Sequence, residues 1–355
     1  MGWSEKVGLG WAAVRYRGIR GAGNLLAAMR DLWLEPERVA SQVHYAQIEP
    51  TTICNLRCVQ CDNPFIPKER VRHMTLPQLA VILDKLPYLR KLSLVGVGET
   101  LLNPDIVAMV RLARARGISV GFATNGTLLT EAKARALVGA GIDWINVSLD
   151  GATPETFERI RVGAKFSRVT DNVRSLVRVV GDRRKPELSV WFVAMQENLP
   201  ELPALVRLVG RLGVRRLCVQ GLHSWGKTSW RERMAGRSIQ GMDGGAMTLF
   251  RQALATANRI GVQLRLLNLG DASARRGCNW PWKAFYVTVE GYVTPCCIHG
   301  TDPAVINFGN LLTDEFSTIW NGPAYQEFRR ALKSPQPHSI CVGCPSYHKP
   351  MTMAS

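Results

Sequence analysis

Three cysteines, Cys54, Cys58 and Cys61, stand within eight positions of one another in the spacing C-x3-C-x2-C. Structural zinc is usually held by four ligands, and a cubane iron–sulfur cluster also takes four cysteines as a rule. Three thiolates would leave one iron of a cubane with an open position, where a small molecule can bind and receive an electron. We therefore predict a [4Fe–4S] cluster with one open iron. Three unrelated core cysteines are not favoured, because the intervening Asn55 and Arg57 are not core residues.

A second group of cysteines near the C-terminal end can close a complete site: Cys278, Cys296, Cys341 and Cys344. The first two flank a predicted hairpin, and the C-x2-C pair lies beyond a predicted helix. Clustered cysteines in a chain without a secretory pattern favour metal over disulfides. Four thiolates suit either zinc or an iron–sulfur cluster, so the residues alone leave both open.

The elements that must position these cysteines alternate between short β-rich runs and amphipathic helical segments. The β-rich runs cover residues 43–50, 89–96, 119–125, 144–150, 188–195 and 215–222. Six β-then-α units predict an α/β fold, a parallel sheet curled into a partial (β/α)6 barrel. Sites in such barrels lie at the C-terminal ends of the strands, and the three-cysteine segment follows the first strand. We divide the chain into a helical arm, the barrel, a linker with a helix, and a small cysteine-bearing domain, at 1–42, 43–222, 223–269 and 270–355.

A C-x3-C-x2-C loop after the first strand of a partial barrel resembles the radical S-adenosylmethionine (SAM) superfamily. The resemblance implies that Cys54, Cys58 and Cys61 are the ligands of the cluster and that SAM chelates the open iron. In that family, reduction of the cluster cleaves SAM to a 5′-deoxyadenosyl radical, which abstracts a hydrogen atom from the substrate. One departure is Gln60, because the residue before the third cysteine is often aromatic.

Polar and glycine residues at the predicted strand ends are similar to the SAM-binding motifs of this superfamily. The segment GVGET at 96–100 resembles its G-G-E-P motif, with Val97 and Thr100 as departures. Glycines let the backbone approach the SAM amino group, and a glutamate can accept its N–H bonds. For TNG at 124–126 and SLDG at 148–151, turn formation and helix capping stay open as alternatives. The resemblance implies that the SAM-binding residues are Gly96, Gly98, Glu99, Thr124, Asn125, Ser148, Asp150 and Arg161.

The C-terminal cysteine pattern is similar to that of the SPASM/twitch group of radical SAM enzymes. Cys278 is followed by Gly291, Cys296 and the C-x2-C pair, and no cysteine follows Cys344. Full SPASM domains continue with further cysteines and hold two auxiliary clusters. The resemblance therefore implies the shortened twitch form with one auxiliary [4Fe–4S] cluster, as in the twitch-type aminocyclitol dehydrogenase, and an electron-relay role for it.

Two cysteines remain outside both sets. Cys218 lies in a predicted strand, where a cysteine is usually buried, and Cys297 alternates to the opposite face from Cys296. A thiol can also donate a hydrogen atom to a substrate radical. Cys218 and Cys297 are therefore the candidate hydrogen-atom donors of a radical epimerisation.

Composition and charge limit the location and the partners. The 355 residues are 46% hydrophobic and 21% charged, without an apolar run of the ~18 residues of a membrane span, which predicts a cytoplasmic globular protein. The net charge of +17 suits nucleic acid, an anionic membrane or an acidic redox partner. Without a long Lys/Arg run nucleic acid is not favoured, and a flavodoxin- or ferredoxin-type reductant is expected. Between Lys6 and Arg30 there are five basic and no acidic residues, which fits a membrane-associated segment or a helical arm packed on the barrel.

The combined pattern predicts a radical SAM enzyme of oxidoreductase or epimerase type. We expect a small polar metabolite as substrate, of the sugar or aminocyclitol type, in natural-product biosynthesis. This expectation rests on the single-cluster pattern and on the lack of a separate peptide-recognition domain. Two alternatives stay open: an enzyme that modifies a ribosomally made peptide, and a non-catalytic iron–sulfur or nucleic-acid-binding protein.

Overall fold

The fold comes from a computed structural model that describes residues 3–222, 234, 236–239, 244–267, 277–342, 344 and 347. For residues 3–17 and 244 it describes the backbone alone. Most of the predicted linker at 223–245 lies outside the described residues.

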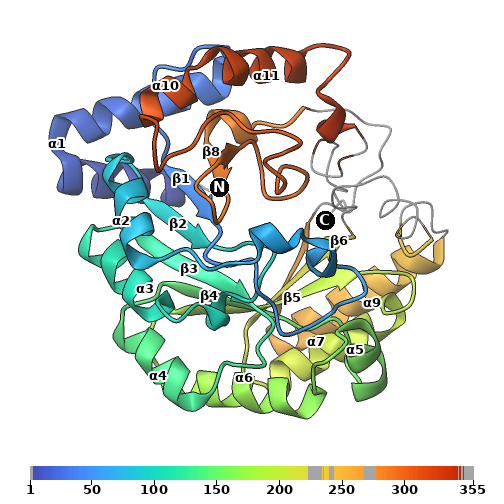
Figure 1. The fold of residues 1–355 in the computed structure, drawn as a ribbon. Coiled ribbons are helices and arrows are strands. Elements are labelled where there is room, and N and C mark those ends of the chain that lie inside the picture. The colour runs from blue at the N-terminus through green and yellow to red at the C-terminus, as the bar shows by residue number, and fades with distance from the viewer. Residues whose placement is uncertain are drawn as a thin grey trace.

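A nine-stranded sheet forms the centre of the molecule, in the order β7-β6-β5-β4-β3-β2-β1-β8-β9 (Figure 1). The first six strands are parallel and confirm the predicted partial barrel: β1 (Tyr45–Ile48), β2 (Lys91–Leu94), β3 (Ser119–Thr124), β4 (Trp144–Ser148), β5 (Glu187–Ala194) and β6 (Arg216–Gly221). A seventh parallel strand, β7 (Gln263–Leu267), extends the sheet beyond β6. The sequence predicted a linker and a helix in this segment and missed the strand. Its short run contains a charged residue and therefore gives little strand signal by itself.

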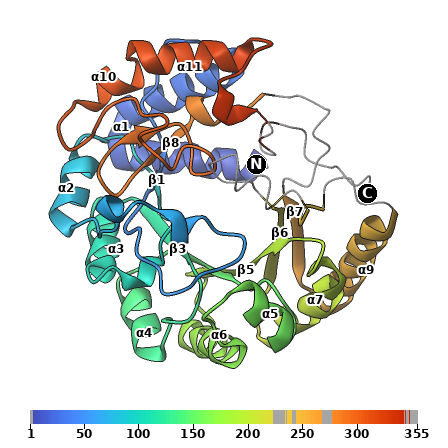
Figure 2. The same cartoon turned by 45° about the vertical axis from the view of Figure 1, so that its right-hand side comes forward.

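Helices cover the outside of the curled sheet (Figure 1, Figure 2). They are α2 (Leu76–Asp84), α3 (Ile106–Ala115), α4 (Glu131–Gly139), α5 (Pro154–Ile160), α6 (Phe166–Val180), α7 (Leu202–Arg211) and α9 (Gly244–Ile260). In α7, Leu202, Leu205, Val206 and Val209 repeat at helical spacing, and all four are buried. Thr75 begins α2 with a capping box, in which its side chain accepts from the Gln78 backbone N–H and Gln78 reaches back.

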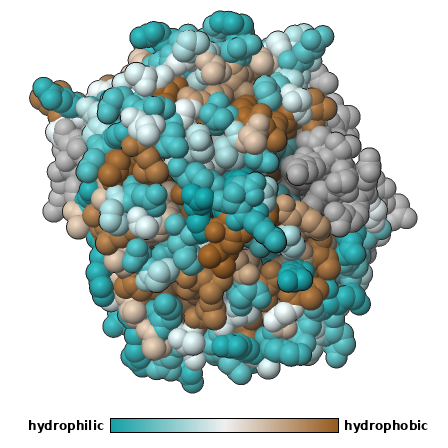
Figure 3. Space-filling view, in the orientation of Figure 1, coloured by the Kyte–Doolittle hydropathy of each residue, from teal (hydrophilic) through white to brown (hydrophobic). Residues whose placement is uncertain are grey.

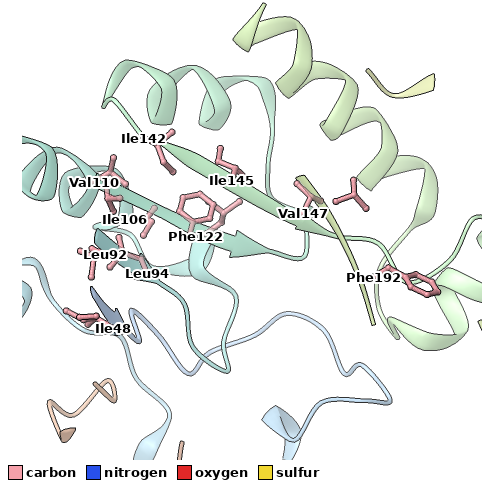
Figure 4. Close-up of a cluster of buried hydrophobic side chains, with 14 of the residues drawn as sticks. Ile48, Leu92, Leu94, Ile106, Val110, Phe122, Ile142, Ile145, Val147 and Phe192 are labelled. Carbon is pink, nitrogen blue, oxygen red and sulfur yellow. The ribbon is translucent and has the colours of Figure 1, made fainter. Parts of the chain in front are cut away.

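The main core lies between the sheet and these helices (Figure 4). Ile48, Phe122 and Ile145 point outward from β1, β3 and β4, and Ile106 and Val110 of α3 point inward toward them. All five side chains are fully buried. Because strand side chains alternate between the two faces, the residues between them point into the barrel.

The C-terminal segment is joined to the same sheet. Strand β8 (Ala284–Val287) pairs in parallel with β1, and β9 (Val293–Thr294) pairs antiparallel with β8. The predicted hairpin is therefore present, and Gly291 takes the positive φ of 93° that its turn requires. Helices α10 (Phe316–Trp320) and α11 (Pro323–Lys333) follow it.

The N-terminal helix α1 (Trp3–Leu34) lies beside α10 and α11 at the edge of the molecule, and both views agree on this (Figure 1, Figure 2). Arg329 of α11 is fully buried and donates to the carbonyl oxygens of Pro281, Glu37 and Trp320 at 3.0, 3.0 and 2.8 Å. Its guanidinium also lies 4.4 Å from the centroid of the Trp320 ring. One cation thus joins the N-terminal segment to the C-terminal domain.

The outer surface is of mixed polarity. On the face seen in Figure 3, apolar and polar side chains are interspersed. No helix within the described residues is long and apolar enough to cross a membrane.

Candidate active site: two cysteine sites joined by a barrel cavity

The three-cysteine loop begins directly after β1, at the C-terminal end of the barrel strands. Cys54, Cys58 and Cys61 are free, half-buried thiols. Backbone N–H groups point at two of the sulfurs: Leu56 N lies 3.5 Å from Cys54 Sγ, and Asn63 N lies 3.4 Å from Cys61 Sγ. Burial raises the pKa of Cys58 to about 11, so these thiols need a nearby cation to ionise. Such N–H contacts to sulfur are among those that tune iron–sulfur clusters.

Amide side chains hold this loop against the end of β3. Asn55 Nδ2 donates to Thr127 Oγ1 at 2.9 Å, and Asn125 Nδ2 donates to Asn55 Oδ1 at 3.0 Å. Asn63 Nδ2 donates to the Thr52 carbonyl oxygen at 2.7 Å. The sequence predicted Asn125 here but missed Asn55, Thr127 and Asn63. Only Asn55 carried a signal in the sequence, as a polar residue between the cysteines.

The two predicted glycines permit a close approach, and in this structure they approach the cysteine segment. A Cβ atom on Gly98 would lie 2.7 Å from the Ile53 carbonyl oxygen, and one on Gly96 would lie 2.6 Å from Glu49 Oε1. The absence of side chains at these two positions therefore lets the loop after β2 pack against residues 49–53, which precede Cys54. A contact between these glycines and SAM stays a prediction.

Glu99, Thr124 and Asn125 come together, as predicted from their places at strand ends. Glu99 Oε1 accepts from Thr124 Oγ1 at 2.6 Å and from Leu101 N at 3.1 Å, while Oε2 accepts from Asn125 N at 2.7 Å. Burial raises the pKa of Glu99, although these bonds oppose it. The carboxylate thus joins the ends of β2 and β3.

Asp150 holds two side chains of the cysteine site. Its Oδ2 accepts from Gln60 Nε2 at 2.6 Å and pairs with Arg161 Nη2 at 2.7 Å, and its Oδ1 accepts from Val193 N at 2.8 Å. Burial lowers the pKa of Arg161, but the interactions with Asp150 and Cys58 outweigh this effect, and the net shift of the pKa is upward. Gln60, which departs from the aromatic residue expected there, is thus fixed by hydrogen bonding.

Within the described part of the chain, two polar atoms at this site are buried without a hydrogen-bond partner: Arg161 Nε and Gln60 Oε1. Buried polar atoms are normally satisfied, so such a pair indicates a group that binds there. Together with the half-buried thiols, these atoms fit an iron–sulfur cluster with a polar small molecule beside it.

A cavity of about 1040 Å³ fills the barrel between the two cysteine sites. Ser148 and Arg161 line it near the three-cysteine loop, whereas Asp150 is fully buried behind them. Two hydrogen-bonded pairs of polar side chains from neighbouring strands are among its lining residues. Tyr45 Oη lies 2.9 Å from Ser93 Oγ, and Ser189 Oγ donates to Asn146 Oδ1 at 2.6 Å.

The four C-terminal cysteines come together at the far end of this cavity. Cys278, Cys296, Cys341 and Cys344 all line it. Burial raises the pKa of Cys341, and the other three thiols raise it further, in the order Cys296, Cys344 and Cys278. Within the described ranges, no three Cys, His, Asp or Glu side chains are placed to hold a single metal ion. Four thiolates at one end of the cavity suit either zinc or an iron–sulfur cluster.

The two candidate hydrogen-atom donors also line the cavity. Cys218 lies on β6, is 4% exposed and lines the cavity. It is therefore a buried strand residue, as expected, and its thiol also faces the cavity. Cys297 lies beside the Gln47 side chain, and burial raises the pKa of the Cys297 thiol to about 12. A donor role for either thiol stays a prediction.

Comparisons with known proteins match both halves of the chain. A model of the radical SAM superfamily matches residues 48–188, and a model of an iron–sulfur cluster-binding domain, SPASM, matches residues 278–345. Together they cover more than half of the chain. The chain is 28% identical over 319 residues to the tungsten-containing aldehyde ferredoxin oxidoreductase cofactor-modifying protein of Pyrococcus furiosus, covering 84% of this chain and 86% of the relative.

Two further comparisons also extend over most of the chain. The chain is 28% identical over 312 residues to the PqqA peptide cyclase of Ruegeria pomeroyi, covering 83% of this chain and 78% of that protein. The solved structure of Streptococcus suis SuiB bound to precursor peptide SuiA is similar in fold, with a TM-score of 0.65 at 14% identity over 93% of this chain and 75% of that one.

These findings overturn the predicted substrate class and reaction subtype. The two relatives named above that match along most of their length are a cofactor-modifying protein and a peptide cyclase, and neither supports oxidation or epimerisation of a sugar or aminocyclitol. The substrate class was inferred wrongly from the cysteine pattern. That pattern indicates the number of clusters, whereas the residues that line the cavity determine which substrate binds.

The cysteine geometry, the partial barrel and both domain matches agree, and they set aside the non-catalytic alternative. The protein belongs to the radical SAM superfamily: it is a radical SAM enzyme with a C-terminal SPASM-type domain, and iron–sulfur clusters and SAM are its cofactors.

Proposed function

We propose that this enzyme modifies a ribosomally made peptide. The observation that carries the proposal is the single cavity of about 1040 Å³ that reaches from Arg161, beside the three-cysteine loop, to the four C-terminal cysteines. Such a volume is at the upper end of ordinary small-molecule pockets and leaves room for peptide residues beside SAM. The full-length similarity to a peptide cyclase supports the same substrate class.

The proposed roles divide the chain's residues between the two ends of the cavity. Cys54, Cys58 and Cys61 hold the cluster that binds SAM, which, when reduced, supplies the 5′-deoxyadenosyl radical. Arg161 and Ser148 face the cavity and contact SAM. A second set of residues positions these groups from behind: Gly96, Gly98, Glu99, Thr124, Asn125 and Asp150.

One auxiliary cluster, held by Cys278, Cys296, Cys341 and Cys344, is proposed at the other end. This is the twitch-like arrangement expected from the cysteine count. A closed cluster keeps all its ligands while it accepts or passes an electron, so the role that fits it is redox relay. Such a site lets a radical reaction end with an electron leaving the substrate.

Three cations that line the cavity favour a peptide that carries carboxylates. Lys91, Arg265 and Lys283 line the cavity, and none of them has a carboxylate partner among the described ion pairs. Lys91 Nζ also lies 5.5 and 5.8 Å from the ring centroids of Tyr45 and Trp144. Cations next to aromatic rings bind acidic and aromatic side chains.

The electron for SAM cleavage is proposed to come from a flavodoxin- or ferredoxin-type protein. The net charge of +17 attracts an acidic partner, and such attraction weakens in salt. Raising the salt concentration should slow SAM cleavage driven by flavodoxin but leave cleavage driven by dithionite unchanged. Equal slowing of both would remove the support for an acidic protein donor.

The decisive experiment is co-expression with a short peptide encoded beside the gene, followed by mass spectrometry of the peptide. The wild-type enzyme should change the peptide mass, and the Cys58→Ala variant should leave it unchanged. In reconstituted enzyme, 5′-deoxyadenosine should form together with the modified peptide. Stoichiometric 5′-deoxyadenosine with a metabolite and none with the peptide would refute the peptide assignment while leaving the radical SAM assignment intact.

A further inference from the structure

Helix α1 presents a row of large apolar side chains to solvent. Ile19, Leu26, Met29 and Trp33 are 92, 67, 54 and 83% exposed. At 3.6 residues per turn, the spacings of seven, three and four place all four side chains on one side of the helix. We call these four residues the α1 apolar face. Isolated exposed apolar residues are normal, but an aligned row of this size indicates an interaction surface.

The opposite side of the helix is fixed to the body of the protein. Asn24 Nδ2 donates to the Gln42 carbonyl oxygen at 3.0 Å, and Asn24 Oδ1 accepts from Gln42 N at 2.7 Å. Asp31 Oδ2 accepts from Ala40 N and Ser41 N at 2.9 and 2.7 Å. Because these four bonds set the rotation of the helix, the apolar face cannot turn inward without breaking them.

Two basic residues of α1 accompany the apolar face. Arg20 is exposed, and the side chain of Arg30 is 55% exposed and pairs with Asp31 at 3.0 Å. From Lys6 to Arg30 the sequence has five basic and no acidic residues, and the whole chain carries +17. A second copy of the chain would bring two such positive surfaces together, which electrostatic repulsion opposes.

We propose that the α1 apolar face binds an anionic phospholipid surface, with the helix in the plane of the membrane. A helix with an apolar side, a tryptophan and flanking cations has the composition of interfacial helices, whose binding combines apolar burial with attraction to anionic lipids. The cations commit the proposal to anionic lipid, since neutral lipid would use only the apolar side chains. This binding is independent of the reaction proposed for the barrel.

The test is co-sedimentation of the reconstituted enzyme with large vesicles of phosphatidylcholine, alone or mixed with phosphatidylglycerol. Wild-type enzyme should sediment with the mixed vesicles at low salt and be released by high salt. Leu26→Gln with Trp33→Gln should abolish sedimentation. Arg20→Gln with Arg30→Gln should lower binding to the mixed vesicles about 30-fold, as the loss of two cations near an anionic surface implies.

The control variant is Val305→Gln, which changes a side chain of similar exposure, 58%, outside α1. It should bind vesicles like the wild type, and all variants should cleave SAM at the wild-type rate, which shows that they fold. The proposal is overturned if wild-type enzyme stays in the supernatant with mixed vesicles, or if the Leu26→Gln/Trp33→Gln variant sediments with them. If the wild-type enzyme is a dimer in solution and the Leu26→Gln/Trp33→Gln variant is a monomer, the α1 apolar face serves self-association and the membrane proposal is wrong.

Discussion

The two cysteine sites use the same side chain but are supported by different chemistry. The three-cysteine loop is held by amide and carboxylate groups such as Asn125 and Asp150, which reach it from distant strand ends. The four-cysteine site lies in a domain packed by aromatic rings, for example Phe308 and Tyr325 with centroids 4.1 Å apart. An open cluster needs polar neighbours that can meet a charged small molecule, whereas a closed cluster has a protein ligand on every iron and does not.

The largest effect should come from removing one thiol at each site in turn. Cys58→Ala should abolish SAM cleavage and remove about half of the iron, since two cubanes hold about eight. Cys341→Ala should also remove about half of the iron but keep SAM cleavage, while the modified peptide no longer forms. Iron analysis and chromatography of 5′-deoxyadenosine measure both. Loss of cleavage in Cys341→Ala with retention in Cys58→Ala would reverse the two assignments.

The polar support of the open site can be broken at Asp150. Asp150→Asn leaves the buried Arg161 guanidinium without its carboxylate, and breaking a buried ion pair from one side costs about 3–5 kcal/mol. We expect that loss in the free energy of unfolding, together with weaker SAM binding by calorimetry. The matched control is Glu37→Gln, which removes an exposed pair with Arg330 and should change neither quantity measurably. Equal effects of the two variants would show that the Asp150 pair is not special.

The joint between the two regions is testable through pH. Glu49 is fully buried and accepts from Val97 N at 3.0 Å and from Val289 N at 3.1 Å, so it joins the barrel to the C-terminal hairpin. Burial raises the pKa of Glu49 from 4.5 to about 7. Between these values the folded protein binds the extra proton, and the free energy of unfolding therefore falls as pH rises, by about 3 kcal/mol from this group. Glu49→Gln should flatten that slope in denaturant melts between pH 5 and 7.5. An unchanged slope would contradict the role of Glu49.

The smallest expected effect concerns the close approach at Gly98. Gly98→Ala should cost about 1–3 kcal/mol, because the new Cβ would meet backbone atoms of the cysteine segment. Gly23→Ala, in α1, meets nothing within 4 Å and should be neutral or slightly stabilising. Thermal melts compare the two, and iron content should fall only in Gly98→Ala. A harmless Gly98→Ala would mean that the loop has room to move.

The sequence predicted the parts of this protein that depend on local pattern. The spacing of the cysteines and the alternation of β-rich and helical runs are local, and both identified the barrel and its clusters. The pairing of Gln60 with Asp150 spans 90 positions, and that of Asn55 with Thr127 spans 72, so no local pattern contains them. Strand β7 was missed because a strand at the end of a sheet takes its stability from pairing with β6. The substrate class was wrong because it depends on a cavity assembled from all the strands.

The parallel pairing of β8 with β1 makes the C-terminal domain hard to remove. A chain cut before β8 would leave β1 with one unpaired edge, along the four residue pairs that join the two strands. Exposed strand edges recruit other chains, so a truncated barrel should aggregate rather than persist as a smaller enzyme. The auxiliary domain is therefore not an exchangeable module: gene fusions and deletions that treat residue 270 as a boundary should yield insoluble protein.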